Sequence, residues 1–134
     1  MTNNKDAQSK QNHRSLALWA ADCAERVLPY FEKECPKDDR PRKAIEVGRA
    51  WAHSDAPMVM KEIRSASLAS HAAARETDNA SARAAARSVG QAVATVHVSG
   101  HARAAAAYAI KAVEAQGIDS TKERDWQSQH YPQH

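Results

Sequence analysis

Alanine is the residue that most constrains the fold of this chain, because it supplies 29 of the 134 residues. Alanine has the highest intrinsic helix propensity, since its methyl group loses no side-chain conformational entropy in a helix. Residues that interrupt helices are few, with four glycines and five prolines. Val, Ile and Thr never cluster into the alternating runs of a half-buried strand. We therefore expect an all-α protein.

Apolar residues recur at three- and four-residue steps in five segments, and this spacing predicts amphipathic helices. The first segment, 15–34, starts with Ser15 as its cap and contains Pro29. This proline should kink the helix or end its regular part near Val27. The other segments are 40–53, 54–78, 80–98 and 101–117. Short loops favour antiparallel neighbours, so we expect a single-domain bundle or HEAT-like stack of about five helices.

Helix-ending residues mark the boundaries between these segments. Asp39 with Pro41, and Asp55 with Pro57, are typical of a capping residue followed by a proline in the first turn. Gly117 is expected to end the fifth helix in a left-handed conformation. The loops thus contain the residues that helix termini prefer.

The ends of the chain are more polar than its middle. Residues 1–14 hold almost no apolar side chains, and we expect a disordered tail there. Residues 15–117 form the expected helical domain. Residues 118–134 form a polar extension, with a short helix expected over 121–127.

The sequence predicts a cytoplasmic protein. No run of about 18 apolar residues could cross a bilayer, and the N-terminal segment lacks the apolar core of a secretory signal. Cys23 and Cys35 are the only cysteines, too few for a zinc-binding quartet, and should remain thiols. Cys23 lies on the apolar side of its helix, where a small buried side chain is expected. We expect no membrane partner.

The net charge of +3 is modest, and basic and acidic residues alternate along most of the chain. Nucleic-acid-binding domains usually carry a concentrated basic stripe, so we expect no nucleic-acid partner. The one local excess, DDRPRK at 38–43, is interpreted as a solvated loop that leads into a helix.

Two histidines in the stretch TVHVSGHA, His97 and His101, are the clearest candidates for a metal or catalytic site. Their i, i+4 spacing can present two metal ligands on one helix face, and His71 could approach them if the third and fourth helices pair. However, HVSGH lacks the glutamate of the metalloprotease pattern, and Gly100 tends to break the helix. We therefore predict no cofactor, and keep a divalent metal at His97 and His101 as an alternative.

Asp22 and Arg26 are a second candidate for chemistry, beside Trp19 on the first helix. At i, i+4 spacing they are interpreted as a partly exposed ion pair, with an acid/base site as the alternative. The sequence contains no glycine-rich phosphate loop and no serine nucleophile elbow.

Four blocks of sequence carry a family resemblance. They are LALWAADCAERVLPYFE, DDRPRKAIEVGRAWA, HAAAR and AVATVHVSGHARAAAAYAIKAV, in that order. Over about residues 15–115 the chain resembles the immunity type five-like group of small all-helical bacterial and archaeal immunity proteins. The family's last block has Pro-Thr where this chain has Ser99 and Gly100.

The resemblance implies a helical protein that neutralises a toxin by binding it. Within the matching blocks, the candidate binding residues are Arg40, Arg42, Trp51 and Tyr108. A small helical enzyme or ligand-binding protein becomes the better hypothesis if the polar residues of these blocks meet in one cleft. The candidate catalytic residues for that alternative are Asp22, Arg26, His71, His97 and His101.

Three functional hypotheses follow from the sequence. An immunity-type binding protein should present one acidic or apolar surface patch suited to a cognate toxin, and no organised polar cleft. An enzyme should bring Asp22, His71, His97 or His101 into one pocket. A homo-oligomeric helical module should pack alanine-lined faces against its own copies. The first is favoured, because no catalytic set is complete.

Overall fold

The computed structural model describes residues 4–54 and 60–133, and within these ranges the chain is all-helical, as predicted. The described residues form six helices rather than about five: α1 (Asn4–Glu34), α2 (Arg40–His53), α3 (Met60–Arg75), α4 (Ala80–Ala94), α5 (His101–Ala115) and α6 (Thr121–His130). The sixth is a longer form of the short helix expected over 121–127. None of the described helices has the length and apolar character needed to cross a membrane.

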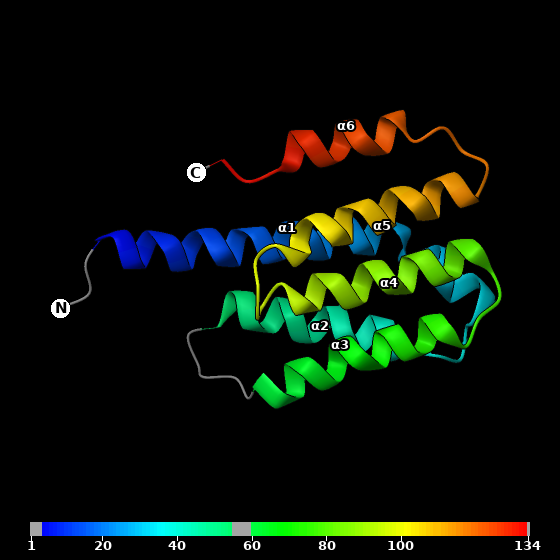
Figure 1. Ribbon diagram of the computed structural model, residues 1–134, viewed down its shortest axis with the longest axis horizontal. Helices are drawn as coiled ribbons and strands as arrows, with labels where there is room; N and C mark the ends of the chain where they lie inside the picture. Colours follow the sequence, from blue (N-terminus) through cyan, green and yellow to red (C-terminus); the bar gives the residue numbers. More distant parts are fainter. Residues whose placement is uncertain (1–3, 55–59, 134) are drawn as a thin grey trace.

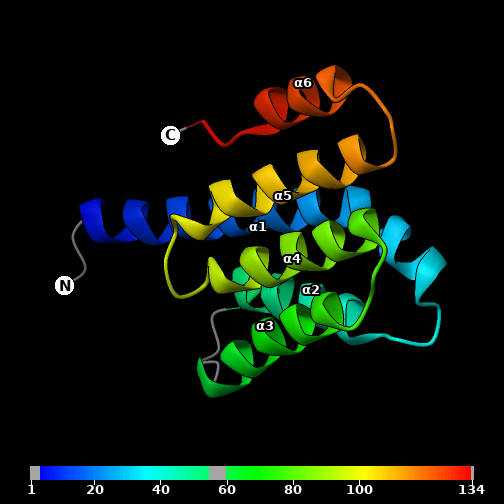
Figure 2. The same cartoon turned by 45° about the vertical axis from the view of Figure 1, so that its right-hand side comes forward.

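The helices pack as a bundle with two layers (Figure 1). In the view of Figure 1, α3, α4 and α5 lie side by side, α1 and α2 lie behind them, and α6 runs along the outer side of α5. Figure 2 shows the same order after a turn of the molecule, with successive helices running in opposite directions. Helix α4 is the centre of the fold, because it packs against α1, α2, α3 and α5.

Helix α1 corrects the prediction for the N-terminal segment. It begins at Asn4, so the described part of the expected disordered tail is helical, and Ser15 lies inside the helix instead of capping it. His13 connects this segment to the rest of the fold. Its Nε2 donates to the carbonyl oxygen of Thr95, and its ring lies edge-on to Trp51 with the centroids 5.0 Å apart. The contacts of His13 thus stabilise the start of α1, which its polar composition had suggested to be disordered.

Pro29 does not end α1, although ending it was one of the two outcomes that the sequence suggested. The helix continues to Glu34, and Pro29 itself is exposed. Leu28 and Phe31 are completely buried on the opposite side. Burying two such side chains stabilises the turn by about 2 kcal/mol each, which offsets the roughly 3 kcal/mol that a proline costs inside a helix.

The core contains many alanines and is crossed by hydrogen bonds from buried serines. Ser67 and Ser70 of α3 donate to carbonyl oxygens of α4. Ser81 and Ser88 of α4 donate to carbonyl oxygens of α5, over 2.8 and 2.7 Å. A hydroxyl reaches the backbone of a neighbouring helix only when the two axes are close, and small residues allow this. The serine hydrogen bonds therefore join α3 to α4 and α4 to α5. They add to the stability of interfaces in which alanine side chains bury little apolar area.

Helix α4 ends at Ala94, before the predicted end at residue 98. Thr95 donates its hydroxyl to the carbonyl oxygen of Gln91, a side-chain bond that competes with helix continuation. The β-branched Val96 and Val98 also lower the helix propensity of this stretch. His97 therefore lies in a turn and not on the helix.

The predicted helix ends are confirmed in part. Gly117 has a φ of +77° and donates to the carbonyl oxygen of Glu114, as expected for a left-handed helix end. Pro41 lies in the first turn of α2, as predicted. Asp39 occupies the cap position, but its side chain makes no capping hydrogen bond. The cap and proline predicted at Asp55 and Pro57 lie outside the described residues.

Gly48 offers a test of packing between α2 and α4. A methyl group added there would lie 3.7 Å from Val93, an ordinary contact distance. Alanine also loses less backbone entropy than glycine on folding, so Gly48→Ala is expected to stabilise the protein by about 0.5–1 kcal/mol. Urea unfolding followed by circular dichroism measures this change. Gly90→Ala is the contrasting variant, because its methyl group would lie 2.5 Å from the ring of His71. Equal effects of the two substitutions would contradict this packing.

Candidate functional site

The outward-facing side of α4 is a basic stripe. Arg83, Arg87 and Gln91 follow one another at four-residue steps, so they share one side of the helix, while most other residues of α4 are buried. The sequence holds no Asp or Glu between Asp78 and Glu114. This stretch therefore corrects the view that basic and acidic residues alternate along the chain.

A groove of about 370 Å³ between α4 and α5 extends this stripe into a larger site. Arg83 and Arg87 line it from α4, and Tyr108 and Lys111 line it from α5. Tyr108 is only half-buried and not a full core residue, and the Lys111 ammonium lies 5.4 Å from the centre of its ring. We call Arg83, Arg87, Tyr108 and Lys111 the basic face.

Two of the three charges of the basic face lack carboxylate partners among the described residues, and the third has only a distant one. In the part of the chain that the structure describes, neither Arg87 nor Lys111 forms an ion pair. Arg83 donates to a backbone carbonyl of the α3–α4 loop, and its nearest carboxylate, the fully exposed Asp78, is 4.0 Å away. The groove therefore has a positive potential that the protein itself does not neutralise.

His71 and His101 border the basic face. The Arg87 guanidinium donates to Nδ1 of His71 over 3.0 Å, and the His71 ring covers the space beside Gly90. Burial lowers the pKa of the His71 imidazole, and the positive charges of Arg87 and Arg75 lower it further. His71 is therefore neutral at pH 7, as its role as acceptor from Arg87 requires. His101 donates from Nδ1 to the side-chain oxygen of Gln91 over 2.7 Å.

The histidine pair His97 and His101 does not lie on one helix. His97 is in the turn after α4, where its Nε2 is buried and finds no hydrogen-bond partner among the described residues. His101 begins α5. No group of three or more His, Cys, Asp or Glu side chains that could hold a metal ion is found over residues 4–54 and 60–133. The metal hypothesis therefore has no three-ligand site in the described chain.

Asp22 and Arg26 point to different neighbours and do not form the ion pair expected along α1. Asp22 pairs with Arg49 of α2 at 2.7 Å. Arg26 forms a two-pronged pair with Glu123 of α6, at 2.7 and 3.0 Å, and its guanidinium lies 4.2 Å from the centre of the Trp126 ring. Both residues are thus engaged in packing between helices, away from His71 and His101.

Most carboxylates of α1 are paired with arginines of α2. Glu25 accepts from both Arg42 and Arg49, and Glu32 accepts from Arg42. The hydrogen bond from Arg49 is the main cause that lowers the pKa of Glu25. The charges between α1 and α2 are therefore neutralised by ion pairs, unlike those of the basic face.

The other candidate binding residues also make contacts within the fold. Arg40 pairs with Asp38 and with Glu76, which connects the start of α2 to the end of α3. Trp51 is half-buried against His13. Of the four binding residues suggested by the resemblance, only Tyr108 lies on the basic face.

Cys23 is buried, as expected. Burial raises the pKa of its thiol to about 12, and the nearby charges of Glu123 and Asp22 act in the same direction. Compared with a thiol at the ordinary pKa of 9.0, it forms about a thousand times less thiolate. Cys35 is only half-buried, and both cysteines are free.

We therefore predict that iodoacetamide modifies one thiol of the native protein, Cys35, and reaches Cys23 only after unfolding. Mass spectrometry of the intact protein would show a single addition. The Cys35→Ser variant is the control and should stay unmodified until urea is added. Rapid modification of that variant in the native state would contradict the burial of Cys23.

Sequence reasoning missed Arg83, Arg87 and Lys111, which make the surface patch basic where the sequence suggested an acidic or apolar one. The signal that could have found them is the absence of acidic residues between Asp78 and Glu114. The net charge of the whole chain, +3, does not reveal this local excess of basic residues. The predicted ion pair between Asp22 and Arg26 was wrong because α1 contacts two different helices along its length.

Comparisons with known proteins add one finding. A family model described as Imm-5 like putative immunity protein matches residues 6–134, nearly the whole chain. No curated protein and no solved structure shows significant similarity to the chain.

Proposed function

Since the chain belongs to the Imm-5 like putative immunity protein family, we propose that it neutralises a protein toxin by binding it directly through the basic face. The observation that carries this proposal is the lack of ion-pair partners for Arg87 and Lys111, beside an aromatic side chain. Arginine and tyrosine are enriched among residues that dominate binding energy in protein interfaces. The partner surface is therefore acidic.

Direct binding fits the arrangement better than catalysis. The candidate catalytic residues do not meet, because Asp22 and Arg26 contact α2 and α6 while His71 and His101 border the basic face. Uncompensated charge, in contrast, accelerates association with an oppositely charged protein and selects against like-charged ones.

A genetic experiment tests whether the protein confers immunity. Open reading frames from the source organism are expressed singly in a host, with and without this chain. The proposal expects at least one reading frame that stops growth alone and is tolerated when the chain is present. The absence of any such gene would contradict the proposal.

The binding surface is tested with the purified toxin and calorimetry. Lys111→Glu and Arg87→Glu are each expected to weaken binding by about tenfold or more at low salt, because they place like charges opposite the acidic partner. Lys37→Glu, in the exposed loop between α1 and α2, makes the same change in charge and is the matched control. Equal weakening by Lys37→Glu and Lys111→Glu would show that net charge, and not the basic face, determines binding.

A further inference from the structure

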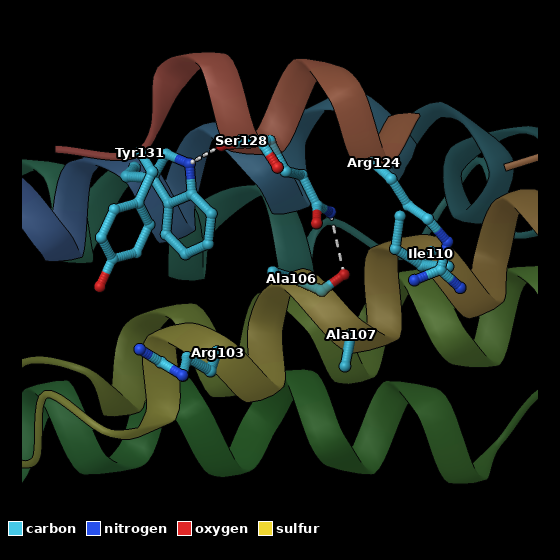
Figure 3. Close-up of a pocket in the computed structure, with 9 residues that line it drawn as sticks. Arg103, Ala106, Ala107, Ile110, Arg124, Ser128 and Tyr131 are labelled. Atoms are coloured by element: carbon cyan, nitrogen blue, oxygen red, sulfur yellow. Dashed lines mark hydrogen bonds between the residues drawn. The ribbon is translucent and has the colours of Figure 1, made fainter. Parts of the chain in front are cut away.

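A second hollow lies between α5 and α6, on the other side of α5 from the basic face. It has a volume of about 520 Å³, within the range of small-molecule sites. Its apolar surface comes from Trp19, Ala106 and Ile110, of which Trp19 and Ile110 are only 7% and 5% exposed. Figure 3 shows the α6 residues above this pocket and the α5 residues below it.

Directional polar bonds join α6 to α1 and to α5. The Trp19 indole N–H donates to the carbonyl oxygen of Gln127 over 3.0 Å, and the Gln127 side chain donates to the carbonyl oxygen of Ala106 over 3.0 Å. Arg26 binds Glu123, whose side chain is nearly buried. Few backbone contacts join α5 and α6 compared with the other helix pairs. These hydrogen bonds and the ion pair fix the position of α6. The space between α5 and α6 remains open as a pocket.

The unpaired charge of the pocket lies at one end. Arg103 and Tyr131 lie at one end in Figure 3, and Arg124 lies at the other. Arg124 has Glu114 at 3.8 Å and Ser120 at 3.2 Å. Arg103 has no hydrogen-bond or ion-pair partner among the described residues, although it lines the pocket. An anionic group would thus find its free counter-ion at the Arg103 end.

We propose that this pocket binds a small organic anion with a flat apolar body. The acid group meets the guanidinium of Arg103, and the apolar body lies on Trp19 and Ile110. Arg103 and Ile110 are two turns apart on α5, or about 10 Å along the helix axis, so an extended ligand can reach both side chains. The site is independent of the toxin interface, because its side chains face α6 and not α4.

Titration with 8-anilinonaphthalene-1-sulfonate, an aromatic sulfonate, tests the proposal. The readout is the indole N–H signal of each of the three tryptophans in an amide correlation spectrum. The expected result is saturable binding that shifts the Trp19 signal most. N-phenyl-1-naphthylamine, the same aromatic body without the sulfonate, should bind about fivefold more weakly or worse. Non-saturable binding, or an equal affinity for the uncharged probe, would overturn the proposal.

Two arginine variants test the position of the acid group. Arg103→Gln should weaken sulfonate binding by about fivefold or more, because it removes the free charge. Arg103 is exposed and bonds to no other described residue, so this variant should retain the fold. Arg124→Gln is the matched control in the same pocket and should change the affinity by less than about twofold, because Glu114 already compensates it. An unchanged affinity for Arg103→Gln would overturn the proposal.

Discussion

Replacing Phe31 with alanine is expected to lower the free energy of unfolding by about 3–5 kcal/mol. Phe31 is 0% exposed and is the largest of the fully buried side chains. Much of the surrounding core is alanine, whose side chain has no alternative rotamer with which to fill a cavity. The cavity should therefore persist, which places the cost at the upper part of the range seen for such truncations.

Urea unfolding followed by circular dichroism measures the effect of Phe31→Ala. The dependence of the free energy of unfolding on urea concentration should be the same as in the unsubstituted protein, which shows that the change lies in stability alone. Phe31→Leu retains much of the volume and is the control, with an expected loss below about 1.5 kcal/mol. A loss below about 1 kcal/mol for the alanine variant would mean that the turn after Pro29 contributes little to the core.

Replacing Ser88 with leucine is expected to lower the free energy of unfolding by about 2–4 kcal/mol. Ser88 is 0% exposed, and its hydroxyl donates to the carbonyl oxygen of Ala105 over 2.7 Å. Leucine removes this bond and forces α4 and α5 apart at a contact built from small residues. Because α4 packs against four other helices, a shift of its axis disturbs the whole core.

A series at the same position separates the two causes. Ser88→Ala removes only the hydrogen bond and should cost about 1 kcal/mol. Ser65→Leu, at an exposed position of α3, is the surface control and should change stability by less than about 0.5 kcal/mol. The prediction is wrong if Ser88→Leu is no more destabilising than Ser88→Ala, since the interface would then have room for the larger side chain.

The location of the charged residues shows where sequence reasoning stops. Asp22 and Arg26 have ideal helical spacing for a mutual pair, yet each contacts a different helix. Spacing along one helix says which side chains share a side, but not whether another helix offers a better partner. The same reason explains why Arg40 and Arg42, suggested as binding residues, are engaged in ion pairs within the fold.

The sequence by itself determined the all-helical class, the family and the helix ends near Pro41 and Gly117. The class and the helix ends depend on propensities and capping groups that act within a few residues, whereas the family is read from the order of four blocks along the chain. Only the tertiary structure decided that α1 begins at Asn4, which charges remain unpaired on the basic face, and that α6 leaves a pocket beside α5. Those features depend on distances between helices, and the packing of small residues across the bundle sets those distances.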